Sequence, residues 1–183
     1  MDFLFNIDIS IVRFIREFIA NPVLDFLMPV ITLIGEDGLL WIVLSLILLF
    51  FKKTRKAGFV MALSLLLGFL TINVTIKPLF DRVRPYVIDN VPILIKGLGD
   101  GSFPSGHTAC CFEGAASLLL CGYRKWGKLA LLGAVLVAFS RIYLYVHYPS
   151  DVIAGAILGV IIAYISLFIV NKTLEKVQKS KTL

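Results

Sequence analysis

The longest apolar stretches of this 183-residue chain decide what it can fold into. Four of them approach the length of a bilayer-spanning helix, which needs roughly 20 apolar residues. They lie at residues 57–76, 108–122, 129–146 and 152–170. A shorter apolar run covers 39–51, and polar residues interrupt a further run at 14–34. Because these segments leave no room for a separate soluble domain, the sequence predicts an integral membrane protein.

The alternative is a soluble bundle of helices with a large core. Such a bundle would show polar stripes at helical spacing, but residues 39–51 and 152–170 are apolar on every side. We therefore predict an all-α, integral membrane bundle of six transmembrane helices, forming one domain over residues 1–183. The predicted spans cover about residues 21–35, 38–51, 57–77, 107–122, 129–146 and 149–171. An interfacial amphipathic helix is predicted at 9–20, where charged residues alternate with apolar ones.

The charge pattern predicts an orientation in the membrane. The formal net charge is +6, but the basic residues are not gathered on one exposed face as nucleic-acid binding would require. They collect in short segments at 52–56, 124–128 and 172–181. The positive-inside rule assigns such segments to the cytoplasm, and the N-terminus joins them if residues 14–34 cross the bilayer. The opposite side then receives Glu36, Asp37, Asp81, Asp89 and Asp100.

Cysteine usage argues against a metal centre or a disulfide framework. Cys110, Cys111 and Cys121 lie within one predicted span. Their odd number and the lack of a C-x-x-C pair are typical of reduced packing residues. No metal or other cofactor is predicted. The first twenty residues also lack the basic segment and cleavage site of a secretory signal peptide.

Polar residues occupy the ends of several predicted spans. Alternate crossings bring one set of these ends to the non-cytoplasmic face, where we expect the site. The set consists of Lys77, Arg84, Ser105, His107, Arg141, His147 and Asp151. A charge at mid-bilayer costs about 2.5–3.5 kcal/mol on insertion scales. Three cations near one face therefore predict a bound anion or a water-filled opening, although a single Lys or Arg at a span end is more often an interfacial anchor.

The segment SFPSGHTA, residues 102–109, places a helix N-terminus at this face. Free backbone N–H groups and the positive end of the helix dipole make such a terminus a site for phosphate. Gly106 lets a ligand approach the backbone, and Ser105 can cap the helix or donate to the ligand. A plain N-cap is the alternative, but it does not explain His107 in the first turn.

The second histidine has a carboxylate four residues away. Asp151 can fix the tautomer of His147 and support its charge, as in hydrolytic triads. A satisfied polar pair at a span end is the alternative. Nearby cations favour a neutral His147, whereas bound phosphate favours a charged His107. Opposite protonation states predict a bell-shaped pH dependence of activity.

Three motifs in this region resemble those of a known family. KPLFDRVRP (77–85), PSGH (104–107) and SRIYLYVHYPSD (140–151) are similar to the signatures K-x6-RP, PSGH and SR-x5-H-x3-D of the type 2 phosphatidic acid phosphatase superfamily. Every defining position is filled, with matching spacing. The family also contains soluble acid phosphatases and vanadium-dependent haloperoxidases, so the motifs alone leave the reaction open.

The resemblance implies a role for each motif residue. His147 would attack phosphorus and form a phosphohistidine, Asp151 would hold its other nitrogen, and His107 would protonate the leaving oxygen. The phosphoryl oxygens would be held by Lys77, Arg84, Ser105, Gly106 and Arg141.

Three other polar residues leave alternatives open. Arg82 could assist a second phosphate or pair with Asp81 on the surface. Asn73, one helical turn before Lys77, could orient that lysine. Glu113 lies inside a predicted span, where we expect it to meet another polar group of the bundle rather than to take part in the chemistry.

The resemblance implies a metal-independent lipid phosphatase, multi-pass in the cell membrane, whose activity survives EDTA. The short loops are similar to those of small bacterial members, which places undecaprenyl diphosphate first as substrate. Phosphatidylglycerophosphate and phosphatidate are the alternatives. A non-catalytic lipid-phosphate binder or transporter is the alternative of another class, and loss of His107, His147 or Asp151 would favour it. All three are present. Lipid phosphate and the bilayer are the predicted partners, and the oligomeric state stays open.

Overall fold

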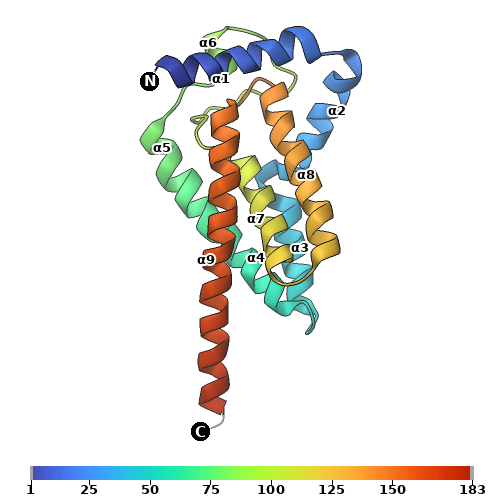
Figure 1. The fold of residues 1–183 in the computed structure, drawn as a ribbon, viewed down its shortest axis with the longest axis vertical. Coiled ribbons are helices and arrows are strands. Elements are labelled where there is room, and N and C mark those ends of the chain that lie inside the picture. Colours follow the sequence, from blue (N-terminus) through green and yellow to red (C-terminus); the bar gives the residue numbers. More distant parts are fainter. Residues whose placement is uncertain (1, 182–183) are drawn as a thin grey trace.

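The computed structural model describes residues 2–181, which form helices and turns without a strand. Residues 1 and 182–183 of the predicted single domain lie outside the described residues. Most helices run along one axis, and α1 (Asp2–Phe14) crosses one end of the bundle (Figure 1). A π-helical turn, η1 (Ile15–Ile19), follows α1. The all-α prediction is confirmed for this part of the chain.

Two of the predicted spans form a single passage along the bundle. This passage consists of α2 (Pro22–Thr32), the 3-10 turn η2 (Leu33–Gly38) and α3 (Leu39–Phe50). It starts where the Asn21 N–H donates to the Tyr143 hydroxyl (3.3 Å), and it ends where the Tyr123 hydroxyl donates to the Lys53 carbonyl (2.8 Å). The two tyrosines flank opposite ends of α8 (Arg124–Tyr143).

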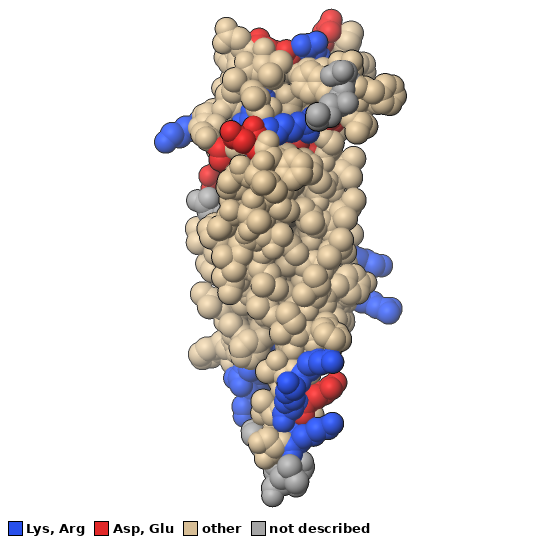
Figure 2. Space-filling model, turned by 90° about the vertical axis from the view of Figure 1, so that its left-hand side faces the viewer, with Lys and Arg blue, Asp and Glu red and all other residues tan. Residues whose placement is uncertain are grey.

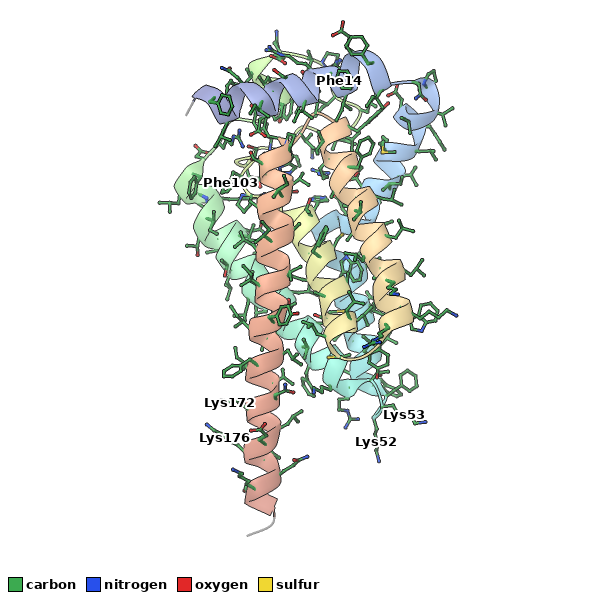
Figure 3. The ribbon with its side chains drawn as sticks, viewed as in Figure 1. Phe14, Lys52, Lys53, Phe103, Lys172 and Lys176 are labelled. Carbon is green, nitrogen blue, oxygen red and sulfur yellow. The ribbon has the colours of Figure 1, made fainter. Side chains whose placement is uncertain are left out.

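The prediction of separate crossings at 21–35 and 38–51 is therefore wrong. Gly38 has φ +66°, which lets the chain bend between α2 and α3 without reversing, and the two helices meet at 45°. As a result, α1 lies at the end opposite Lys52 and Lys53 (Figure 3). The prediction that the N-terminus shares a side with the basic segments is wrong for the same reason.

Three of the described helices are long and apolar enough to cross a membrane, namely Arg55–Ile88, Arg124–Tyr143 and Pro149–Ser180. The bent α2–α3 pair adds a fourth. The central α7 (Gly106–Leu120) has 15 residues, a length of about 22 Å. The predicted count of six is not confirmed. In Figure 2 a broad belt of uncharged residues separates an end with charges of both signs from an end that carries mainly Lys and Arg, as expected for a chain embedded in a bilayer.

The helix that leads to the site contains a wide turn. It runs from α4 (Arg55–Gly68) through the π-helical η3 (Phe69–Ile76) into α5 (Lys77–Phe80). The predicted span ends at residue 77, but the helix continues to Phe80. Pro78 occupies an early position of α5, where its missing N–H costs little. Asp81 then takes a left-handed conformation, and the short α6 (Pro85–Ile88) follows.

The centre of the bundle is α7, which packs against α4, α8 and α9 (Pro149–Lys181). Close approach of α9 depends on two glycines spaced four residues apart. A Cβ atom on Gly155 or Gly159 would lie 2.5 Å from a backbone oxygen of α7, that of Ser105 or Ala109 respectively. Small residues at this spacing allow helix backbones to touch in membranes. The contact sets Ser105 and the first turn of α7 against the first turns of α9.

We expect Gly159→Ala to lower the thermal unfolding midpoint of the detergent-purified protein by several degrees. The new methyl group would force the two backbones apart, and overpacking of this kind costs about 1–3 kcal/mol. Gly133→Ala in α8 is the matched control, because nothing lies within 4 Å of a Cβ atom there. Equal midpoints for the two variants would show that α9 does not depend on this contact.

Candidate active site

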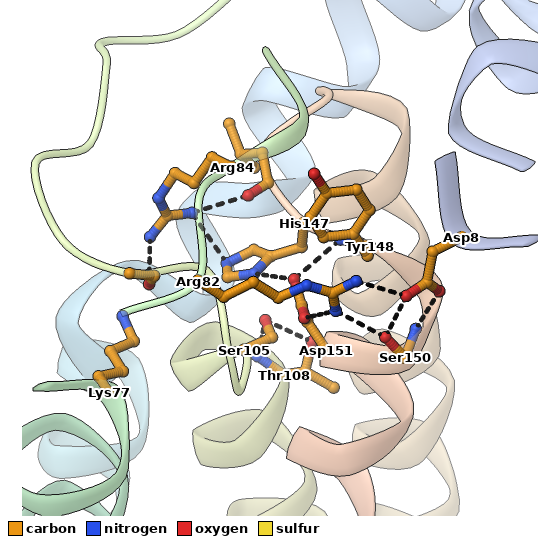
Figure 4. Close-up of polar contacts among 12 residues, drawn as sticks. Asp8, Lys77, Arg82, Arg84, Ser105, Thr108, His147, Tyr148, Ser150 and Asp151 are labelled. Atoms are coloured by element: carbon orange, nitrogen blue, oxygen red, sulfur yellow. Dashed lines mark hydrogen bonds and ion pairs between the residues drawn. The ribbon is translucent and has the colours of Figure 1, made fainter. Parts of the chain in front are cut away.

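One end of the bundle collects the motif residues from six places along the chain. Lys77 opens α5, Arg84 precedes α6, and His147 lies in the turn between α8 and α9. The other members are Ser105, Gly106 and His107 at the start of α7, Arg141 in the last turn of α8, and Asp151 in the first turn of α9. The predicted convergence of these side chains is present in the structure. Figure 4 shows five of them together, namely Lys77, Arg84, Ser105, His147 and Asp151.

His147 is almost completely buried and is flanked by charges of both signs. Its Nε2 lies 3.3 Å from Nη1 of Arg84, and its Nδ1 lies 3.5 Å from Oδ2 of Asp151 (Figure 4). A guanidinium can only donate hydrogen bonds, so Nε2 must carry the lone pair. The proton of the neutral ring is then on Nδ1, which faces the carboxylate.

The surroundings of His147 favour this neutral form. Burial, followed by the positive charges of Arg141, Arg84 and Lys77, lowers the pKa of His147 well below its usual value. A neutral imidazole with a free lone pair on Nε2 can act as a nucleophile. The electrostatics thus prepare one nitrogen of this ring for attack on an electrophile.

Two of the surrounding cations are held by a carboxylate that sequence reasoning did not place in the site. Asp100 forms ion pairs with Nζ of Lys77 and, at 2.8 Å, with Nη2 of Arg84. Burial would raise the pKa of Asp100, but the hydrogen bond from Lys77 and the charges of Lys77 and Arg84 outweigh it and lower this pKa to about 2. The ionised, half-exposed Asp100 therefore occupies the two groups that a phosphate would need.

We expect Asp100→Asn to lower KM and the inhibition constant of inorganic phosphate, each by about 3–10-fold, because a competing anion is removed from Lys77 and Arg84. Steady-state phosphate release in detergent measures both constants. Asp81→Asn is the control, because Asn also accepts the left-handed conformation of residue 81. An increase of KM in Asp100→Asn would show that Asp100 orients the cations instead of competing with substrate.

Arg141 has donors that no group within the described residues 2–181 satisfies. Its Nη1 donates to the Thr32 hydroxyl at 2.8 Å, whereas Nε and Nη2 have no hydrogen-bond partner although the side chain is buried. Buried donors without acceptors are costly and uncommon. Their position beside His147 in a cavity indicates that an anion completes the site.

The start of α7 contributes a cap and a second histidine. The Ser105 hydroxyl accepts hydrogen bonds from the Thr108 N–H (3.4 Å) and from the Thr108 hydroxyl (2.9 Å). Ser105 is therefore an N-cap of α7, the alternative given for this segment. Gly106 lines the cavity, and a Cβ atom there would lie 3.1 Å from Oδ1 of Asn73. His107 Nε2 lies 3.3 Å from Oε2 of Glu36 in η2, a contact that the sequence did not reveal.

A cavity of about 830 Å³ begins at these side chains and continues between the helices. Its polar end is formed by Lys77, Arg84, His107, Arg141 and His147. The remainder has a largely apolar lining. It includes Ile42 and Leu46 of α3, Leu65 and Leu66 of α4, and Phe69 of η3. The cavity therefore suits a molecule with an anionic head and an apolar chain.

The three residues with open alternatives are placed differently from expectation. No hydrogen bond joins Asn73 to Lys77 among the described residues, and Asn73 lies against Gly106 instead. Glu113 is buried at the cavity wall beside Gly68, and no described side chain donates a hydrogen bond to its carboxyl group. Arg82 pairs not with Asp81 but with Asp8 and Asp151.

Within residues 2–181, no three His, Cys, Asp or Glu side chains gather as metal ligands. The groups at the polar end are mostly cationic, an arrangement that binds anions rather than metal ions.

Comparison with protein families decides the assignment. The model of the PAP2 superfamily matches residues 53–175, more than half of the chain and all three motifs. The chain belongs to the PAP2 superfamily. The resemblance of the motifs to the type 2 phosphatidic acid phosphatases is thereby confirmed, and the long apolar helices agree with a multi-pass membrane protein.

Individual PAP2 relatives are similar over most of the chain. A Sulfolobus acidocaldarius protein named undecaprenyl-diphosphatase is 38% identical over 128 residues, which cover 69% of this chain and 62%, less than two thirds, of that protein. A lipid A 4'-phosphatase of Bacteroides thetaiotaomicron is 31% identical over 97% of this chain and 83% of that protein. The crystal structure of a PAP2 type phosphatidylglycerolphosphate phosphatase from Bacillus subtilis superposes with a TM-score of 0.74 at 30% identity, covering 96% of this chain and 88% of that chain.

Proposed function

We propose that this PAP2 member hydrolyses a membrane lipid phosphate or diphosphate through a phosphohistidine at His147, without a metal ion. The observation that carries the proposal is the incomplete anion site around His147. Arg141 presents two N–H groups without a partner, and Nε2 of His147 carries a lone pair beside Arg84. A phosphoryl group bound among these residues supplies the missing acceptors and brings phosphorus to the nucleophile.

In the first step, Nε2 of His147 attacks phosphorus, and the bond from phosphorus to the leaving oxygen breaks. Asp151 accepts a hydrogen bond from the Nδ1–H group of His147 and stabilises the positive charge that develops on the imidazole ring. His107 donates a proton to the leaving oxygen. Lys77, Arg84 and Arg141 stabilise the negative charge on the phosphoryl oxygens.

In the second step, water attacks the phosphohistidine and returns the electron pair to His147. His107, now neutral, accepts a proton from this water, as microscopic reversibility requires of the group that acted as acid. Inorganic phosphate leaves, and His147 is again neutral. Protonation of His147 stops the first step and loss of the His107 proton slows it, so kcat/KM should follow a bell-shaped pH profile.

The cavity supports a lipid substrate whose chain remains among apolar side chains while its head reaches the cations. We place undecaprenyl diphosphate first, since the loops are short and the Sulfolobus relative bears that name. Phosphatidylglycerophosphate and phosphatidate come next. The site lies at the end opposite Lys52, Lys53, Lys172 and Lys176 (Figure 3). Since basic segments favour the cytoplasm, we assign the site to the non-cytoplasmic face.

The test is release of inorganic phosphate by the detergent-purified protein in excess EDTA. Undecaprenyl diphosphate, phosphatidylglycerophosphate, phosphatidate and a soluble aryl phosphate are compared. We expect undiminished release in EDTA, and the order of kcat/KM identifies the substrate. Loss of activity in EDTA that magnesium restores would contradict the metal-free mechanism. No release from any lipid by a folded protein would favour the lipid-phosphate binder or transporter.

A further inference from the structure

The catalytic carboxylate is held by a network that reaches the N-terminal helix. Nη1 of Arg82 donates to Oδ1 of Asp151 at 2.6 Å, and Nη2 of Arg82 donates to Oδ2 of Asp8 in α1 at 2.7 Å (Figure 4). Asp8 lies 142 positions before Ser150, the residue that precedes Asp151. Both aspartates are buried, with exposures of 4% for Asp8 and 0% for Asp151. One guanidinium therefore bridges two buried acids.

Asp8 also fixes the backbone turn that presents Asp151. Its Oδ1 accepts from the Ser150 N–H at 3.0 Å, and its Oδ2 accepts from the Ser150 hydroxyl. Ser150 lies in the first turn of α9, where backbone N–H groups have no partner within the helix. A side chain of α1 thus caps α9 from outside, one residue before Asp151.

The orientation of Asp151 depends on contacts to both of its oxygens. Oδ2 accepts from the Tyr148 N–H at 2.9 Å and faces Nδ1 of His147, while Oδ1 is held by Arg82. The torsion that turns a carboxylate is broad, so loss of Arg82 removes the contact that fixes Oδ1 and leaves the Tyr148 N–H to hold the group. Arg82 cannot easily shift, since its guanidinium lies over the Tyr148 ring, 3.9 Å from the centroid.

We propose that Asp8 and Arg82 are positioning residues of the catalytic reaction, and that α1 is in this way part of the active site. They act on His147 through Asp151, whose Oδ2 they keep facing the Nδ1 proton. The inference rests on the proposed function. Neither residue touches the cavity, so both are expected to affect turnover rather than substrate binding.

The test compares Arg82→Gln, Arg82→Lys and Asp8→Asn with the wild type on the best lipid substrate. We expect kcat to fall about a hundredfold in Arg82→Gln and about tenfold in Asp8→Asn, with KM within threefold, because each change removes charge-assisted hydrogen bonds to a buried carboxylate. Arg82→Lys keeps the charge and should recover part of the loss. The kcat of the double variant Asp8→Asn/Arg82→Gln should lie within about twofold of the kcat of Arg82→Gln, since the effects of substitutions at coupled residues are not additive.

A pH profile separates positioning from mere support of the fold. Loss of Arg82 leaves the charge of Asp151 uncompensated, which raises the pKa of His147 and moves the acidic limb of kcat/KM to higher pH. Arg82→Lys should leave that limb near its wild-type position. The other charged or titratable groups that face His147 stay unchanged; they are Lys77, Arg84, His107 and Arg141.

Arg13→Gln is the matched control for the docking of α1. Arg13 binds Asp89 through two hydrogen bonds, at 3.0 and 2.6 Å, but it is exposed and contacts neither Asp151 nor Ser150. We expect its kcat to stay within twofold of the wild type. A loss in Arg13→Gln equal to that in Asp8→Asn, or full activity in both Asp8→Asn and Arg82→Gln, would overturn the inference.

Failure of this inference can be distinguished from failure of the proposed function. An inactive wild type would contradict the function itself, whereas an active wild type with fully active network variants would contradict only the positioning role. Thermal unfolding in detergent identifies a variant that does not fold. If Arg82→Gln does not fold, Arg82→Lys and Asp8→Asn test the positioning role by the same kinetic constants and pH profile.

Discussion

His147→Ala should lower kcat for lipid phosphate hydrolysis by at least about 10⁴-fold, because the nucleophile of the first step is removed and no other group replaces it. The buried ring is surrounded by Arg84, Arg141 and Asp151, and water alone cannot use this arrangement to form a covalent intermediate. The measurement is phosphate release at saturating lipid in detergent. Residual activity above about one per cent would contradict the assignment of the nucleophile.

A comparison with His107→Ala sharpens this prediction. His107 is expected to protonate the leaving oxygen, and an aryl phosphate with an acidic leaving group needs little protonation. His107→Ala should therefore lose much less activity on the aryl phosphate than on the lipid. His147→Ala should lose activity on both substrates equally. The same loss on both substrates for His107→Ala would contradict its role as the acid.

Arg141→Lys should lower kcat/KM by about 10²–10³-fold, the typical cost of removing a preorganised donor to transition-state charge. Nη1 of Arg141 is held by Thr32, which leaves Nε and Nη2, without a partner among the described residues, for the proposed anion. A lysine ammonium cannot hold the Thr32 hydroxyl and present two fixed donors at the same time.

The control for Arg141 lies at the other end of the same helix. Arg124→Gln changes an exposed cation of the basic segment, far from the cavity, and should leave kcat/KM within twofold. Kinetics on the preferred lipid, together with inhibition by inorganic phosphate, would be measured for both variants. If Arg141→Lys had the same kcat/KM and the same inhibition by phosphate as the wild type, the assignment of Arg141 to the anion site would be contradicted.

Much of the fold could be predicted, because apolar runs of helical length have few other solutions in a membrane chain. The helices at 124–143 and 149–181 follow directly from such runs. The two segments before residue 51 were misjudged. Separate spans at 21–35 and 38–51 imply a reversal of the chain between them, whereas Gly38 only bends the chain by using its positive φ. A local sequence of this kind does not distinguish a bend from a turn.

The candidate site was predictable where residues share a motif and not where they meet only in space. The spacing of His147 and Asp151 and the Pro-Ser-Gly-His segment identified the chemistry. Asp8, Glu36 and Asp100 gave no local signal, since each reaches the site from another segment of the chain. Arg82 was visible, but its partners Asp8 and Asp151 could be paired with it only by the packing of α1 on α9.

The most direct test of the account is to trap the covalent intermediate. Lipid substrate labelled with ³²P in its terminal phosphoryl group would be mixed with the protein in EDTA, quenched in alkali within milliseconds, and digested for peptide mapping. The account predicts an acid-labile, alkali-stable label on the peptide that contains residue 147, and no label in His147→Ala. Hydrolysis by the wild type without such a label, or with the label on another residue, would contradict it.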